Sequence, residues 1–252
     1  MDVVRDLADF VMTAPTHGRP EGLLGAICER LAAAGVPVWR GASALHSLSP
    51  EVVGPHLTWS RAAGAKATIR DHALKSTPTW VGTPVQAVIE GEEPFLRCRL
   101  DDAAVLERFP VLRELAATGG TDYVIYRLDY SQGLAATVED PYWRRQWISF
   151  ASDAPAGFGS EHLALIEALL PALSCRMALE GSKDAARSLL RAYLGPHASR
   201  RVLSGAFRRG TGESLRAVIV FSDMRDFTSF SDSRPPAEVV AALDRYFDAL
   251  AS

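Results

Sequence analysis

The residues best suited to take part in chemistry lie near the end of the chain, where a carboxylate follows a short apolar run. Residues 216–221 form a short run that is apolar after Arg216 and β-branched at 218–220, which predicts a buried strand. Asp223 stands just past that run, and residues 227–229 then lead into Pro-Pro and a helix. A carboxylate at a strand end is held rigidly, and a following turn offers free backbone N–H groups. A divalent metal that carries phosphates needs both.

The same residues carry a family resemblance. The stretch Val220-Phe-Ser-Asp-Met-Arg-Asp-Phe-Thr228, followed by Leu-x-x-Tyr-Phe at 243–247, resembles the opening of a class III nucleotidyl cyclase domain. That family reads F-x-D-[I/L/M]-x-G-F-T, and then Pro, an amphipathic helix and Tyr-Phe. The likeness covers residues 215–252, with a looser likeness upstream to the sensor and linker of bacterial cyclases.

The resemblance implies a role for four positions. Asp223 would be the first of two metal-binding aspartates, and Met224 would offer its backbone carbonyl to a metal. Phe227 and Thr228 would give N–H groups to the triphosphate of ATP or GTP. The family uses two Mg²⁺ or Mn²⁺ ions to join the ribose 3′-hydroxyl to the α-phosphate and release pyrophosphate. Its site lies between two subunits, and most of it would fall beyond residue 252.

Asp226 departs from the family pattern, which has glycine at that position. If the turn needs a positive φ, Asp is among the better-tolerated substitutes, at some cost in energy. It also places a second negative charge near the expected triphosphate. Asp226 therefore puts the activity of even a completed protein in doubt. Because the family's second metal aspartate and its purine-selecting residues would lie beyond residue 252, we expect residues 1–252 alone to be inactive, and the sequence does not decide between ATP and GTP.

The same residues leave alternatives to a nucleotidyl cyclase. The chain can be a non-catalytic small-molecule sensor or dimerisation module whose cyclase domain is degenerate or absent. A hydrolase with Asp223 as nucleophile is a poor fit, because nothing near it supplies a partner base or a phosphate-binding Lys. An ordinary solvated Asp at the edge of an α/β domain is the simplest alternative.

Upstream, the order of expected elements resembles a GAF-like sensor domain. Helices come first, then strands, an inner helix, more strands, and a long exit helix with Ser160 as its N-cap. We expect an α+β chain, divided into a GAF-like domain of antiparallel sheet with flanking helices (1–180), a helical linker (181–214) and the start of a ferredoxin-like cyclase domain (215–252). Its individual elements are expected at 2–13, 21–34, 36–48, 49–61, 85–90, 95–100, 106–117, 121–129 and within 134–151.

The linker and the sensor suggest partners. Leu189, Leu190, Tyr193 and Leu194 form an apolar set between the interruptions at 181–182 and 195–196, which favours a homodimer through linker and cyclase domain. An unknown small molecule would be the sensor's ligand. Its pocket would have aromatic candidates that are equally suited to a core: Trp59, Trp80, Tyr142, Trp143 and Trp147.

Composition narrows the class of protein. The net charge of −3 gives no basic field for nucleic acid. No run reaches the roughly 18 continuous apolar residues of a membrane span, and the first residues lack the layout of a signal peptide. Three widely separated cysteines fit a reducing cytoplasm. The last helix, 237–252, has no stop signal, so we expect a piece of a longer protein.

Overall fold

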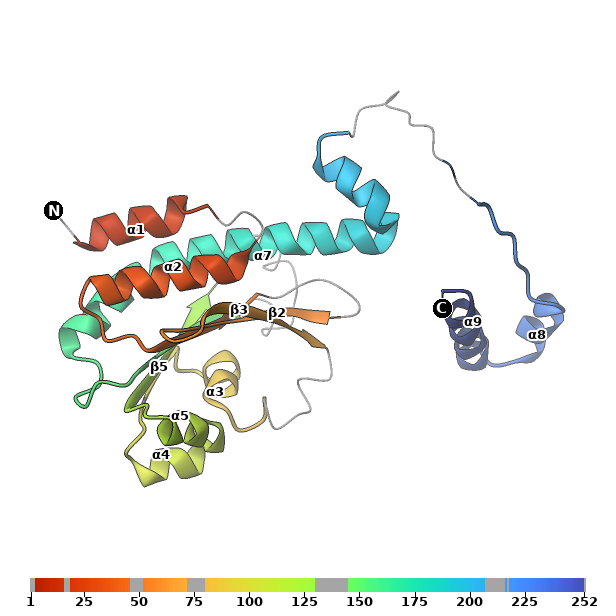
Figure 1. The fold of residues 1–252 in the computed structure, drawn as a ribbon. Coiled ribbons are helices and arrows are strands. Elements are labelled where there is room, and N and C mark those ends of the chain that lie inside the picture. The colour runs from red at the N-terminus through yellow and green to blue at the C-terminus, as the bar shows by residue number, and fades with distance from the viewer. Residues whose placement is uncertain are drawn as a thin grey trace. The chain divides into compact units, whose positions relative to one another are not determined.

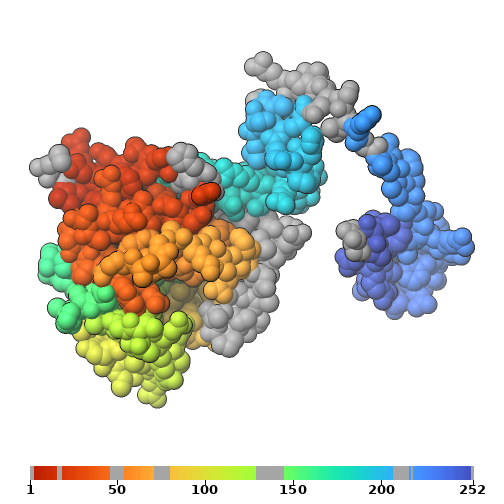
Figure 2. All heavy atoms as spheres, viewed as in Figure 1, coloured from red at the N-terminus to blue at the C-terminus, as the bar shows by residue number. Residues whose placement is uncertain are grey.

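The computed structural model describes residues 3–15, 19–45, 52–71, 80–129, 145–206, 216 and 218–251. The chain divides into two compact units, Met1–Phe207 and Arg208–Ser252 (Figures 1 and 2). Each unit is described by itself. The expected linker boundary at 214/215 lies outside the described residues.

A six-stranded antiparallel sheet forms the centre of the first unit, in the order β3-β2-β1-β6-β5-β4. Strands β1 and β6 meet in the middle, with Ala42 opposite Ser149, and so join the two halves of the sheet. This confirms the expected antiparallel sheet with flanking helices. The strands are β1 (Arg40–Ala44), β2 (Val52–Ser60), β3 (Gly64–Asp71), β4 (Phe95–Arg99), β5 (Asp122–Asp129) and β6 (Arg145–Ser152).

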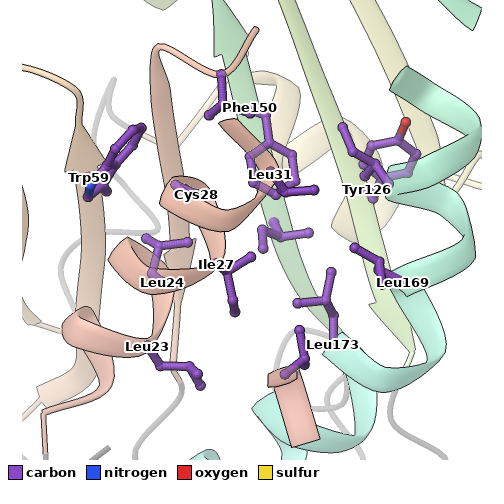
Figure 3. Packing of buried hydrophobic residues seen from close by; sticks show 14 of the residues in the cluster. Leu23, Leu24, Ile27, Cys28, Leu31, Trp59, Tyr126, Phe150, Leu169 and Leu173 are labelled. Atoms are coloured by element: carbon purple, nitrogen blue, oxygen red, sulfur yellow. The ribbon is translucent and has the colours of Figure 1, made fainter. Parts of the chain in front are cut away.

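Helices α2 (Pro20–Ala33) and α7 (Ser160–Leu203) cover one face of this sheet, and α1 (Val3–Thr13) packs mainly on α7, on the side away from the sheet (Figure 1). The apolar residues of α2 recur at helical spacing, and Leu24, Ile27 and Leu31 are buried. Leu169 and Leu173 of α7 face the same interior (Figure 3). The main hydrophobic core therefore lies between the sheet and these helices.

Shorter helices cover the other face. They are α3 (Pro84–Glu90), α4 (Ala103–Arg108), the 3₁₀ turn η2 (Pro110–Leu112) and α5 (Arg113–Ala117). The continuous helix expected over 106–117 is wrong, because Pro110 lacks an N–H and a new turn begins there. Trp80 and Trp147 are buried in the second core on this side, and Trp59 is buried in the main core. Tyr142 and Trp143 lie outside the described residues.

Helix α7 leaves the domain as one long element. It begins after Gly159, whose N–H donates to Nδ1 of His162 at 3.0 Å, so Gly159 and not Ser160 is the N-cap. The helix passes through residues 181–182 without the expected break. It turns sharply at Gly195 (φ 73°, ψ 169°), where a break was expected and where a positive φ costs glycine least. Residues 160–194 are thus continuous across the expected domain boundary at 180.

The apolar side of α7 is used mostly by the domain itself. By length and composition α7 is long and apolar enough to cross a membrane. However, Ile166, Leu169, Leu173 and Met177 pack in the main core. Further along, Arg176 donates to the carbonyls of Met12 and Ala14 and ties the end of α1 to α7.

The second unit contains α8 (Phe227–Ser233) and α9 (Pro236–Ala251). The helix expected from 237 is confirmed. The buried strand expected at 216–221 is wrong: residue 216 and residues 218–221 have no regular structure, and Val218 and Phe221 are 90% and 94% exposed. A strand needs a neighbour for its ladder hydrogen bonds. The described residues of this unit provide none, so the opening strand of a ferredoxin-like domain is not formed.

Candidate functional sites

The first candidate site is the turn that follows the exposed apolar run. Asp223 and Thr228 are exposed, and Met224 and Phe227 are half-buried. The backbone N–H of Phe227 donates to the carbonyl of Met224 at 3.3 Å. The carbonyl assigned to the metal and the N–H assigned to the triphosphate are therefore bonded to each other in this turn.

Asp226 adopts the left-handed conformation (φ 57°, ψ 23°) immediately before α8. It is the only residue other than glycine with a positive φ in the described part of the chain. Asp visits this region more readily than most residues because its short side chain can bond locally, although glycine is favoured. The position where the cyclase pattern has glycine thus requires a glycine-like backbone.

The two halves of the motif contact each other. The hydroxyl of Tyr246 on α9 lies 2.7 Å from the hydroxyl of Ser222, the residue before Asp223. Arg234 also pairs with Glu238 at 3.1 Å at the start of α9, on the surface. The Ser222–Tyr246 bond joins the segment just before Asp223 to α9.

The oxygen atoms at this turn provide only part of the ligand set that a metal ion needs. Asp223 and the Met224 carbonyl are oxygen ligands of the kind Mg²⁺ or Mn²⁺ takes, but Mg²⁺ requires near-octahedral coordination. Among the described residues, no group of three or more His, Cys, Asp or Glu side chains is placed to hold a metal. Two oxygens do not make a metal site without further ligands.

The second candidate site is a cavity of about 370 Å³ on the α5 side of the sheet. Its floor is made of two adjacent cross-strand rows, which the antiparallel register defines. One row contains Lys66, Thr58, Ala42 and Ser149, and the next contains Gly64, Ser60, Arg40, Ala151 and Tyr123. The remaining lining residues are Gly41, Trp59, Ala63 and Leu115.

The cavity exists because small side chains occupy the middle of the floor. Ala42, Ser149 and Ala151 come from the two central strands and leave space that larger residues would fill. Leu115 of α5 contributes an apolar wall. A volume near 370 Å³ is in the lower part of the roughly 300–1,000 Å³ range of small-molecule sites.

The polar groups of the floor remain neutral or positive. The side chains of Tyr123 and Ser149 share a hydrogen bond. Burial raises the pKa of Tyr123 well above its usual value, and the bond to Ser149 opposes this only in part. Tyr123 therefore keeps its proton near pH 7. None of the described residues that line the cavity is acidic.

A titratable group lies one row further along the same face. The His56 ring lies 5.7 Å from the Trp147 ring. Burial, together with repulsion from Arg70, lowers the pKa of His56 to about 4. His56 is therefore neutral at pH 7 and adds no charge beside the cavity.

No sequence pattern predicted this cavity. Among its lining residues, only Trp59 was a predicted candidate for a ligand pocket. A weak signal exists in the small residues at alternate positions, Ala42 and Ala44 on β1 and Ser149 and Ala151 on β6. Alternation places each pair on one face, but only the register between strands that are distant in sequence brings the pairs together.

Comparison with known proteins gives little guidance. The chain matches no protein-family model. It also matches no curated protein. One solved structure with a similar arrangement is bacteriophytochrome RpBphP3 from the photosynthetic bacterium R. palustris, with a TM-score of 0.43 and 9% identity. The alignment covers 82% of this chain but only 43% of the bacteriophytochrome chain.

Proposed function

We propose that the first unit is a GAF-like sensor domain that binds a small molecule in the sheet cavity and passes the event to α7. The cavity of about 370 Å³ carries this proposal. The order of elements supports it: an entry helix, an antiparallel sheet that contains inner helices, and a long exit helix. A sensor needs a ligand site and an output element joined by rigid structure.

Strand β6 supplies that connection. Ser149 and Ala151 line the cavity, and α7 begins after the short segment that follows β6. Tyr123 also lines the cavity, and the next residue back, Asp122, accepts a 3.0 Å hydrogen bond from the N–H of Phe158 in that segment. A ligand that shifts β5 or β6 therefore acts directly on the segment that starts α7.

A thermal-shift screen with a cavity-filling variant tests the sensor function. A ligand at 100 times its Kd stabilises by about 2.7 kcal/mol, which raises Tm by roughly 5–10 °C in a domain of this size. Ala42→Leu should abolish the shift by filling the floor. Ala186→Leu, which adds the same atoms at an exposed site on α7, should leave it intact. A shift that survives Ala42→Leu would contradict the cavity as the ligand site.

We propose that the second unit is the beginning of a class III nucleotidyl cyclase domain. The left-handed backbone at Asp226 favours it, because the family has glycine there. Asp223 and the carbonyl of Met224 would hold Mg²⁺ or Mn²⁺, and Phe227 and Thr228 would contact the triphosphate of ATP or GTP. The Phe227 N–H must first leave the Met224 carbonyl to do so. Dimerisation through α7 would bring two such domains together in the cytoplasm.

An activity assay separates this proposal from a purely non-catalytic sensor. The uninterrupted reading frame that contains these residues is expressed and assayed with ATP and with GTP. Cyclic nucleotide formation that Asp223→Asn abolishes supports the cyclase. A folded, ligand-binding protein that makes neither cyclic nucleotide would leave the non-catalytic sensor as the function.

A further inference from the structure

We propose that the cavity on the α5 side of the sheet takes a small amphipathic organic anion, with a carboxylate or phosphate group on an apolar or aromatic body. This inference rests on the sensor function proposed above and specifies its ligand class. It is carried by two cations, Arg40 and Lys66, at a cavity whose described lining contains no acid.

The register places the two cations on neighbouring rows of one sheet face. Arg40 lies opposite Ser60, and Lys66 lies opposite Thr58, which in turn lies opposite Ala42. Both cations are thus on the cavity side, on β1 and β3, with β2 between them. Arg40 is half-buried and Lys66 is exposed, so Arg40 sits deeper than Lys66.

Neither cation is neutralised by a described carboxylate. Arg40 lies over the ring of Trp39 at 4.4 Å, which orients the guanidinium without cancelling its charge. The nearby Arg61, by contrast, is paired with Asp153 at 2.9 Å. Two positive charges beside apolar surface, with no carboxylate among the described residues to balance them, favour a ligand that brings its own negative charge.

The rest of the floor suits an apolar body with a few hydrogen bonds. Ala42, Ala151 and Leu115 offer apolar surface, while Thr58, Ser60 and the Tyr123–Ser149 pair offer hydroxyls. Arg40 can donate two parallel hydrogen bonds to a carboxylate or phosphate, and Lys66 supplies a point charge. A neutral apolar compound would use the body contacts only.

A matched pair of fluorescent probes tests the ligand class. 8-Anilinonaphthalene-1-sulfonate and N-phenyl-1-naphthylamine share an aromatic body, but only the first is an anion. Each is titrated into the whole chain and into Arg40→Gln/Lys66→Gln, Arg187→Gln and Ala42→Leu. Arg187→Gln removes one charge from an exposed site on α7 and serves as the charge control. 1-Naphthoate and 1-naphthyl phosphate, as competitors, distinguish carboxylate from phosphate ligands.

The expected result is a selective loss. The double variant should weaken sulfonate binding about 10-fold, the lower end of the net contribution of hydrogen bonds to charged groups, and leave binding of the neutral probe within about twofold. Raising the salt concentration should weaken binding of the anionic probe and leave binding of the neutral probe unchanged. The anion inference is overturned if Ala42→Leu abolishes binding of both probes while the double variant leaves both unchanged or weakens both equally. In that case the cavity function stands. If both probes bind Ala42→Leu as well as wild type, both proposals fall.

Discussion

Arg97 and Asp122 form an ion pair across strands β4 and β5, with Nη2 and Oδ2 2.7 Å apart. The Asp122 side chain is fully buried and also accepts the N–H of Phe158, while Arg97 donates to the Phe158 carbonyl at 2.7 Å. The sheet and the segment between β6 and α7 (residues 153–159) thus share one hydrogen-bond network. It holds the start of α7 in a fixed position relative to the cavity floor.

Asp122→Ala should destabilise the chain by about 2–3 kcal/mol in urea unfolding, because it leaves Arg97 and the Phe158 N–H without their partner. A fully buried pair costs about 3–5 kcal/mol to break, but the Arg97 side chain is 34% exposed, so solvent compensates in part. Asp101→Ala, at the exposed pair with Arg99, is the control and should cost much less. Equal losses in both variants would contradict a structural role for the network.

Stability should fall as the pH drops below about 6.5, with His56 as one cause. The folded pKa of His56 is about 4, below the ordinary value of 6.5. Between these values the unfolded state binds the proton and the folded state does not, so acid favours unfolding. Urea unfolding at pH 7 and pH 5 should show a smaller pH-dependent loss for His56→Gln than for wild type. Identical losses would mean that His56 titrates normally.

Asp226→Gly should stabilise the second unit by up to about 1 kcal/mol, because glycine adopts a positive φ at less cost. In a longer, active protein it should also raise turnover, since it removes a negative charge near the expected triphosphate. Asp223→Asn should abolish turnover and leave Tm nearly unchanged, because its side chain is exposed. Loss of turnover in Asp226→Gly would show that Asp226 itself carries the chemistry.

Residues 189–194 of α7, just before the turn at Gly195, should mediate self-association. Tyr193 is 84% exposed and Leu194 48% exposed, while Leu189 and Leu190 are half-buried. Light scattering of wild type should give a dimer mass at high micromolar concentration. The double variant Tyr193→Ser/Leu194→Ser should shift the mass toward the monomer, since it removes the exposed apolar surface. A monomeric wild type at that concentration would contradict pairing through α7.

Sequence alone could predict the elements with strong periodicity. Helix α2 repeats apolar residues at the spacing of one helical face, and Gly35, with φ 92°, ends it as expected. Strand β3 was missed because its alternation of apolar and polar residues over 65–70 rests mainly on alanine, which is depleted in strands, and residues 64–69 of this edge strand are all exposed. The apolar run at 218–221 led to the wrong prediction of a strand for the opposite reason. Its β-propensity is high, but without a partner strand it forms no sheet.

The two candidate sites also differ in how far the sequence predicts them. The motif around Asp223 is local, so its residues and even the conformation of Asp226 could be anticipated from the order of residue types. The cavity depends on the pairing of Ala42 with Ser149, which are far apart in the sequence. Long-range register is decided by the whole core, and no short window of sequence contains it.

Ligand binding in the cavity should change the structure or dynamics of α7. Hydrogen–deuterium exchange measures this directly, on the whole chain with and without the compound that stabilises it most in the thermal-shift screen. We predict slower exchange in β1, β2 and β6 together with a change in residues 153–159 and in the first turns of α7. Ala42→Leu should show neither effect. Protection confined to the strands, with α7 unchanged at saturation, would contradict the sensor function.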